Sequence, residues 1–262
     1  MRIVRFTPGP DAGLGQDPLF GILEDDATIS IISGDPIYSG IQKTAAKIEL
    51  NKVRLLAPII PRSKVVCVGK NYADHAAEMG GVVPDEPIIF LKPNTSVIGP
   101  GDTIVWPSIA PTIDYEAELA IVIGRVCKEV PKERVNDVIF GYTMANDVTC
   151  REIQKRDGQW MRAKSFDTFC PIGPWIETEF VPGNQRITTT LNGEIKQDAK
   201  LSDMIFKVAD IVHFVTQVMT LLPGDVIITG TPAGIGPMPE KSTVAISIEG
   251  LGQLTNKVSA RA

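Results

Sequence analysis

The stretch Asp114-Tyr115-Glu116-Ala117-Glu118-Leu119-Ala120-Ile121-Val122-Ile123 decides the fold, because two acidic residues lead directly into a strongly apolar run. We expect residues 116–123 to form a buried β-strand. Residues i and i+2 of a strand point to the same face, which places Glu116 and Glu118 side by side with Cβ atoms roughly 7 Å apart.

Two neighbouring carboxylates on a buried strand repel each other and lose solvation, and a bound cation is the usual relief. Asp147 ends another apolar run, Val138–Asp147, and could complete a site of three carboxylates. Such an all-oxygen site suits Mg²⁺, Mn²⁺ or Ca²⁺ and not zinc. An edge strand with two solvated glutamates is the alternative that the pattern leaves open.

The rest of the chain is a series of short β-branched runs separated by Pro and Gly, and its 20 prolines disfavour long helices. Two helices are predicted, over Pro131–Val138 and Val208–Leu222. Asn192-Gly193 predicts a β-hairpin. Further strands are expected at Lys64–Val68, Ile88–Leu91, Thr103–Trp106, Val138–Ala145, Ile187–Leu191, Val226–Thr229, Val244–Ile248 and Leu254–Val258. These patterns predict a strand-dominated α+β protein and not an alternating βαβ one.

Residues 1–54 are predicted to form a small N-terminal α/β domain, and residues 55–262 a larger second domain. Arg2–Thr7 and Leu19–Ile32 alternate like strands, the second with a turn at Glu24-Asp25-Asp26. A short helical pattern, Ile41–Leu50, follows. The sequence pattern changes at Leu55, where the short β-branched runs begin.

The composition excludes several classes of protein. A net charge of −5 gives no reason to expect a nucleic acid or an anionic membrane as partner. No apolar run approaches the roughly 18–20 residues of a membrane helix, and the N-terminus has no signal-peptide pattern. The four cysteines are far apart and lack Cys-x-x-Cys spacing, which indicates reduced, buried thiols. A cytoplasmic location is therefore expected.

A short helical turn around residues 71–78 would place His75 and Glu78, three residues apart, on one face. A carboxylate beside an imidazole raises its basicity and fixes its tautomer, as a general base requires. A purely structural pair is the alternative. The second histidine, His213, lies on the polar stripe of a predicted helix and is expected to have no catalytic role.

Two further segments have less specific patterns. Lys164 stands among aromatic and small residues, where a lysine commonly extends its ammonium group toward solvent. The loop from Gly230 to Gly236 lacks the residues of a nucleotide-binding loop. It could still offer backbone N–H groups and the Thr231 hydroxyl to a carboxylate.

The order of these motifs resembles the fumarylacetoacetate hydrolase superfamily, in its short bacterial and mitochondrial branch. The similarity covers about residues 55–258, and residues 1–54 match only as the variable N-terminal domain of such proteins. The residues that carry it are Gly69-Lys70-Asn71-Tyr72-Ala73-Asp74-His75, Glu78-Met79, Phe90-Leu91-Lys92-Pro93-Asn94-Thr95, Asp114–Leu119, Asn146–Arg151, Lys164-Ser165-Phe166, Gly224-Asp225 and Thr229-Gly230-Thr231-Pro232.

The resemblance implies a catalytic domain with a mixed β-roll, in a chain that usually forms homodimers. It implies Mg²⁺ or Mn²⁺ on Glu116, Glu118 and Asp147. It also implies three catalytic residues: His75 and Glu78 on a mobile lid, and Lys164 near the metal. The residues that the resemblance places at the substrate are Tyr72, Arg151, Gln154 and Thr231.

The reaction expected first is cleavage of a carbon–carbon bond in a small 2-oxo acid, through a metal-bound enolate. This is either hydrolysis of an acylpyruvate or decarboxylation of oxaloacetate. The alternative enzyme is a 2-hydroxyhepta-2,4-diene-1,7-dioate isomerase or decarboxylase of aromatic-acid catabolism. A non-catalytic protein that binds 2-oxo acids is the alternative from another class; it would have no need of the His75–Glu78 pair.

Overall fold

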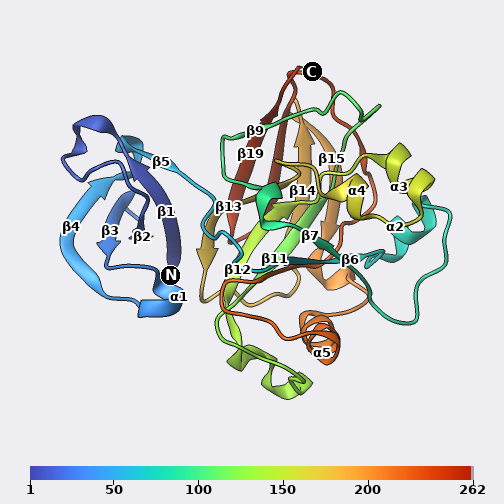
Figure 1. Cartoon of the computed structure of the whole chain (residues 1–262), viewed down its shortest axis with the longest axis horizontal. Helices are drawn as coiled ribbons and strands as arrows, with labels where there is room; N and C mark the ends of the chain where they lie inside the picture. Colours follow the sequence, from blue (N-terminus) through green and yellow to red (C-terminus); the bar gives the residue numbers. More distant parts are fainter. Residues whose placement is uncertain (261–262) are drawn as a thin grey trace.

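The computed structural model describes residues 1–260 and confirms the strand-dominated α+β prediction (Figure 1). One sheet has 12 strands, a second has 5, and β10 (Asp114–Tyr115) pairs with β17 (Gly236–Pro237). Most of the large sheet runs in the order β4-β3-β2-β1-β13-β12-β11-β16-β6-β7. Its second half is built from β6 (Val65–Gly69), β7 (Ile88–Lys92), β11 (Ala117–Ile123), β12 (Ile139–Asn146), β13 (Cys170–Glu177) and β16 (Val226–Ile228).

The N-terminal unit lies on the side of the molecule opposite α2, α3 and α4 (Figure 1). It comprises β1 (Arg2–Pro8), β2 (Leu19–Leu23), β3 (Thr28–Ile32), β4 (Lys43–Glu49), β5 (Val53–Leu55), the short helix α1 (Pro36–Ser39) and the 3-10 turns η1 (Pro10–Ala12) and η2 (Leu50–Lys52). The predicted helix over Ile41–Leu50 is wrong, because β4 occupies this segment. Tertiary pairing with β3, for example Ile29 with Ile48, overrides the local preference.

The sheet of the N-terminal unit continues into that of the rest of the chain. Strand β1 pairs with β13 through Arg2–Glu177 and Ile3–Ile176. The small strand β8 (Val97–Ile98) also pairs with β13. Strand β13 contains Pro171 and Pro174 and was not predicted from the sequence, since proline argues against an interior strand.

The second sheet has the order β15-β14-β18-β19-β9. Its strands are β9 (Thr103–Ile104), β14 (Arg186–Leu191), β15 (Glu194–Lys200), β18 (Thr243–Ile248) and β19 (Gly252–Val258). The predicted hairpin at Asn192-Gly193 is confirmed, since both residues have positive φ between β14 and β15.

Strand β11 contributes to cores on both faces of the large sheet. Leu119 and Ile121 pack in a core with Ile246 and Ile248 of the second sheet, so this core lies between the sheets. Ala120 and Val122 point the other way and pack in a second core that includes Ile3 and Ile22 of the N-terminal unit. Because Glu116 and Glu118 share the parity of Ala120 and Val122, they belong to this second face, at the strand's beginning.

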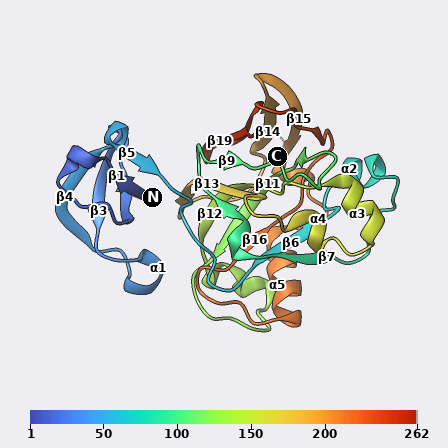
Figure 2. The same ribbon diagram turned by 45° about the horizontal axis from the view of Figure 1, so that its top comes forward.

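The helices are few and short. They are α2 (Ala73–Glu78), α3 (Arg151–Asp157), α4 (Met161–Lys164) and α5 (Val208–Val218), with 3-10 turns η3 (Asn94–Ser96), η4 (Lys132–Asp137) and η5 (Leu201–Asp203). The predicted helix at 208–222 is confirmed but ends at Val218, whereas residues 132–137 form a 3-10 helix. Helices α2, α3 and α4 lie together in two views (Figures 1 and 2). Within residues 1–260, no helix has the length and apolar character needed to span a membrane.

Candidate active site

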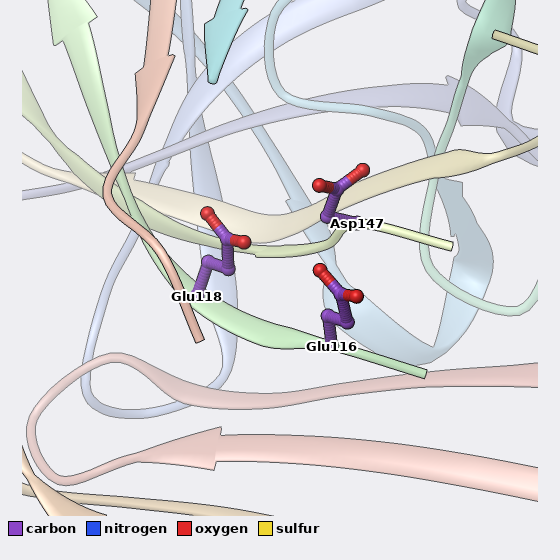
Figure 3. A group of neighbouring side chains, drawn as sticks. All are labelled: Glu116, Glu118 and Asp147. Carbon is purple, nitrogen blue, oxygen red and sulfur yellow. The ribbon is translucent and has the colours of Figure 1, made fainter. Parts of the chain in front are cut away.

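Three carboxylates meet where β11 begins and β12 ends. Glu116 directly precedes β11, Glu118 is its second residue, and Asp147 directly follows β12. The two strands are antiparallel, with Ala117 opposite Asn146, and the Asp147 N–H donates to the Glu116 carbonyl at 2.9 Å. Strand pairing therefore brings Asp147 beside Glu116 and Glu118, which lie 31 and 29 residues before it in the sequence (Figure 3).

The triad is close-packed and buried. One carboxylate oxygen from each of the three residues lies within 4.8 Å of the others, and no member is more than 4% exposed. Burial, reinforced by the charges of Asp147 and Glu116, raises the pKa of Glu118 well above its ordinary value. Glu118 is held in place by the Gly230 N–H, which donates to its Oε2 at 2.7 Å.

Lys164 and Arg151 supply positive charge to the triad. The Lys164 Nζ lies 2.7 Å from Glu116 Oε2 and 2.6 Å from Asp147 Oδ2. Arg151 donates to Glu116 Oε1 at 2.5 Å and, on its other side, to Asp114 Oδ2 at 3.1 Å. Burial alone would raise the pKa of Glu116, but Lys164 and Arg151 outweigh it and hold that pKa well below its usual range.

Lys92 is a further cation, to which the sequence analysis gave no role. It is 1% exposed, and its Nζ lies 2.5 Å from Asp147 Oδ1 and 3.3 Å from the Val148 carbonyl. A fully buried lysine is rare unless a charged partner compensates it. The predicted strand Ile88–Leu91 could have revealed this burial. Residues two apart on a strand share a face, so Lys92 lies on the same face as Phe90.

The donor set fits a divalent cation. Hard oxygen ligands from three carboxylates, gathered around one point, are what Mg²⁺ and Mn²⁺ take. Three cations, Lys92, Arg151 and Lys164, are paired with the carboxylates of Asp114, Glu116 and Asp147. A divalent ion would add positive charge beside them, where an anionic substrate group could bind.

The predicted His75–Glu78 pair is formed on α2. His75 Nδ1 lies 3.0 Å from Glu78 Oε2, and the other carboxylate oxygen of Glu78 accepts a hydrogen bond from the Gly234 N–H at 3.1 Å. Glu78 thus joins α2 to the loop after β16. Because a carboxylate accepts from the Nδ1–H, the Nε2 atom of His75 remains as the basic nitrogen.

A cavity of about 180 Å³ connects these groups. Its walls include the triad, His75, Lys164, Arg151, Gln154 and Thr231. Gln154 accepts from Arg151 at 2.6 Å, and Thr231 accepts from the buried Gln197 at 2.8 Å. Glu78 reaches the cavity only through His75. Tyr72 is not among the residues that line it, and within residues 1–260 its buried hydroxyl has no hydrogen-bond partner.

The two parts of the chain match two protein-family models. Residues 64–259 match the C-terminal domain of fumarylacetoacetate hydrolase. The chain belongs to the fumarylacetoacetate hydrolase family. Residues 1–58 match the Rv2993c-like N-terminal domain, and the predicted superfamily and fold class are thereby confirmed. As a member, the chain is an enzyme of this superfamily; which reaction it catalyses is a separate question.

Known proteins are similar over nearly the whole chain. Human mitochondrial oxaloacetate tautomerase FAHD2A is 42% identical over 287 residues, covering 98% of this chain and 91% of the relative. The structure of a 5-carboxymethyl-2-hydroxymuconate delta-isomerase from Mycobacterium smegmatis is 46% identical, with a TM-score of 0.91 and 100% coverage of both chains. A maleylpyruvate hydrolase from Sphingobium sp. SYK-6, solved with manganese(II) and pyruvate, is 29% identical, with a TM-score of 0.80 and 100% coverage of both chains.

A divalent-metal site is thus consistent with the triad, and a homologous structure contains manganese(II). The domain boundary at residues 54/55, the homodimer, the cytoplasmic location and the individual residue roles remain predictions.

Proposed function

We propose that the protein is a divalent-metal-dependent enzyme that moves a proton at carbon 3 of a small 2-oxo acid. The product would be the tautomer or a double-bond isomer of the substrate. One observation carries the proposal: the buried acidic triad, the Lys164 ammonium and the His75 imidazole all face one small cavity. This set combines a cation site, a fixed positive charge and a base.

A divalent ion on Glu116, Glu118 and Asp147 would act as a Lewis acid on the 2-oxo group. The chain's own residues do the rest. Lys164 is held rigidly by two carboxylates and needs no reorganisation to stabilise negative charge on the substrate oxygen. Arg151, fixed between Asp114 and Glu116, would orient the substrate carboxylate.

His75 would transfer the proton. Its Nδ1–H is occupied by Glu78, so Nε2 accepts a proton from one position of the substrate and returns it to another. In tautomerisation, the proton leaves the enol hydroxyl and a proton is added at carbon 3, so no atom is gained or lost. Glu78 stabilises the imidazolium that forms between the two steps.

Proton transfer takes precedence over bond cleavage because the tautomerase and isomerase relatives are 42% and 46% identical, against 28–36% for the hydrolase structures. Carbon–carbon bond cleavage, expected first from the sequence as acylpyruvate hydrolysis or oxaloacetate decarboxylation, is the second candidate. The same His75–Glu78 pair is suited to activating a water molecule. Oxaloacetate decarboxylation needs no such water, and it is measured in the same assay as tautomerisation through the pyruvate that it forms.

The test is to add enol-oxaloacetate to the protein with Mg²⁺ or Mn²⁺. Loss of the enol is followed by ultraviolet absorbance, and pyruvate formation by proton NMR. Glu116→Gln at equal metal concentration is the control, because free metal itself acts on oxaloacetate. Ketonisation faster than in the control and abolished by a chelator is the expected result.

The same assay distinguishes the candidates. Pyruvate formed in step with enol loss would replace tautomerisation with decarboxylation, and acetylpyruvate cleavage in a parallel reaction would support the hydrolase. Enol loss no faster than with Glu116→Gln would overturn the proposal.

A further inference from the structure

Gln197, in the middle of β15, connects the strand of the acidic triad to the loop that follows β16. Its side chain is buried, with 0% exposure. The Oε1 atom accepts from the Ala117 N–H at 3.0 Å and from the Thr189 hydroxyl at 2.7 Å. The Nε2 atom donates to Thr231 Oγ1 and to the Pro232 carbonyl, both at 2.8 Å. These contacts use the whole hydrogen-bonding capacity of a glutamine amide.

The two backbone partners fix the orientation of this amide. The Ala117 N–H can only donate, and the Pro232 carbonyl can only accept. Turning the amide over would place donor against donor at Ala117 and acceptor against acceptor at Pro232, and both buried hydrogen bonds would be lost. Nε2 therefore faces Thr231. Because an amide N–H can only donate, the Thr231 oxygen has to be the acceptor in this contact.

The hydroxyl hydrogen of Thr231 is thereby left for a partner in the cavity. Thr231 is 1% exposed and is part of the cavity wall. Among residues 1–260, no group accepts a hydrogen bond from its hydroxyl. A buried donor without an acceptor is unfavourable, so this hydrogen is suited to an acceptor atom on a bound ligand.

The loop that carries Thr231 is packed directly on β15. A Cβ on Gly234 would lie 2.3 Å from the Lys196 carbonyl oxygen, so only glycine allows the loop to come this close. Lys196 directly precedes Gln197 in the strand. The contact between Gln197 and Thr231 is therefore supported by close backbone packing beside it.

The other end of the amide contacts the backbone of the metal-site strand. Ala117, whose N–H donates to Gln197, lies between Glu116 and Glu118. A merely structural role of Gln197 would consist of holding this strand and would be measurable as metal affinity. A role through Thr231 would be measurable as affinity for the substrate.

We propose that Gln197 is a positioning residue that makes the Thr231 hydroxyl a hydrogen-bond donor to the substrate. The proposal rests on the proposed function, because the substrate is the 2-oxo acid named there. Carboxylate and oxo oxygens can only accept, so they match this hydrogen, whereas an ammonium group in the same place would not. Gln197 is not in the cavity wall and acts only through Thr231.

Gln197→Glu is the variant that tests this role. The introduced carboxyl group has nearly the same shape and keeps an oxygen that accepts from the Ala117 N–H and the Thr189 hydroxyl. At its other end it has at most one proton, which the Pro232 carbonyl requires. The carboxyl oxygen then accepts from Thr231, whose hydroxyl hydrogen is turned away from the substrate.

Pyruvate is the probe, and calorimetry on the Mn²⁺-loaded protein measures its affinity. Gln197→Glu should weaken pyruvate binding about tenfold or more, because a hydrogen bond to a charged or strongly polar acceptor is lost. Mn²⁺ affinity, measured by electron paramagnetic resonance, should not fall. Thr231→Val should weaken pyruvate binding to a similar degree, whereas Thr231→Ser, which keeps the hydroxyl, should not.

Thr189→Val is the matched control. It also removes a buried hydrogen bond to Gln197, but it leaves the Nε2 contact with Thr231 in place. Its pyruvate affinity should stay at the wild-type value. Melting temperatures with Mn²⁺ check that each variant is folded.

The double variant decides whether Gln197 acts through Thr231. Adding Gln197→Glu to Thr231→Val should weaken pyruvate binding no further, since the hydroxyl is already absent. A second loss as large as the first, or full pyruvate affinity in Gln197→Glu, would overturn the positioning role. Full pyruvate affinity in Thr231→Val would overturn it as well, whether or not Gln197→Glu folds.

The proposed function is tested separately with the same proteins. Hydrogen–deuterium exchange at carbon 3 of pyruvate, followed by proton NMR with Mg²⁺, measures proton transfer against Glu116→Gln as the control. The expected pattern of pyruvate binding without exchange above this control would sink proton transfer and keep the role of Gln197. Fast exchange with pyruvate binding that ignores Gln197→Glu would do the reverse.

Discussion

Lys92 and Asp147 form an ion pair from which solvent is excluded, with 2.5 Å between Nζ and Oδ1 and side chains 0% and 1% exposed. Asp147 is also a member of the acidic triad, and its other oxygen accepts from Lys164. The Asp147 carboxylate thus forms ion pairs with two buried ammonium groups and is also one of the three carboxylates of the candidate metal site. The stability of the fold and the function of the site are coupled at this residue.

Removing one partner of this pair should destabilise the protein strongly. Asp147→Asn leaves the buried Lys92 without an ion-pair partner and should lower the free energy of unfolding by about 3–5 kcal/mol; Lys92→Met leaves Asp147 paired with Lys164 and should lower it by less. The double variant should lose clearly less than the sum, because the lysine charge that Asp147→Asn leaves unpaired is then absent. Urea unfolding with a chelator present measures all four proteins, and strictly additive losses would show that the two residues are not coupled.

Glu78 should act through His75 and not only through its contact with Gly234. Glu78→Gln keeps an oxygen that can accept from the Gly234 N–H but removes the negative charge beside the imidazole. We expect kcat to fall about 10–100-fold with little change in KM. In Glu78→Ala, hydrogen exchange of residues 73–81 should also accelerate. An unchanged kcat in Glu78→Gln would remove the charge of Glu78 from the mechanism.

Substitution of Lys164 should affect metal affinity and turnover differently. Its ammonium contacts Glu116 and Asp147, two of the three carboxylates that a metal would use, so it competes with the ion for negative charge. Lys164→Met is expected to bind Mn²⁺ at least as tightly as the wild type while turnover falls by about 100-fold or more. Mn²⁺ titration by electron paramagnetic resonance gives the affinity. Weaker Mn²⁺ binding in this variant would contradict the competition.

Asp225 should make stability depend on acid pH. It accepts hydrogen bonds from the Ser63 hydroxyl at 2.6 Å, Lys64 Nζ at 2.8 Å and the Leu222 N–H at 2.9 Å. Burial would raise its pKa, but these donors outweigh burial and hold the pKa below its ordinary value.

Because the folded-state pKa is depressed, the stabilisation by ionised Asp225 is complete above the unfolded pKa of about 3.9 and is lost as pH falls from there through the folded pKa. Asp225→Asn should therefore be less stable than the wild type at pH 7. The difference should shrink as the pH falls below about 4. Chemical unfolding at several pH values measures it, and a difference independent of pH would show that the charge of Asp225 is not what stabilises the fold.

The site was more predictable than the elements that frame it. Glu116 and Glu118 are two apart on a strand, and this local geometry alone puts them on one face. That Asp147 joins them depends on the register of β11 against β12, which the sequence pattern does not contain. Lys92 and Asp114 were given no role, because their importance comes entirely from partners far away in the chain.

The elements missed are those whose form is set by tertiary contacts. Lys43–Glu49 is rich in Ala, Lys and Glu, which favour helix, yet it pairs with β3 as an outer strand. Helix α3 has only one buried apolar residue, Ile153, because Arg151 and Gln154 beside it line the cavity. Polar residues at inward positions are what a functional site imposes on a helix, and hydrophobic periodicity cannot detect them.

The pairing of β1 with β13 makes the N-terminal unit a cap on the edge of the catalytic sheet. An uncovered edge exposes unpaired N–H and C=O groups that readily pair with another chain. Here the apolar residues Ile172 and Ile176 of β13 would be uncovered as well, since both pack in the core that includes Ile3 and Ile22. Deleting residues 1–54 would therefore expose an aggregation-prone strand edge on the remaining domain. The solubility of the protein thus depends on a segment that lies far from the candidate active site.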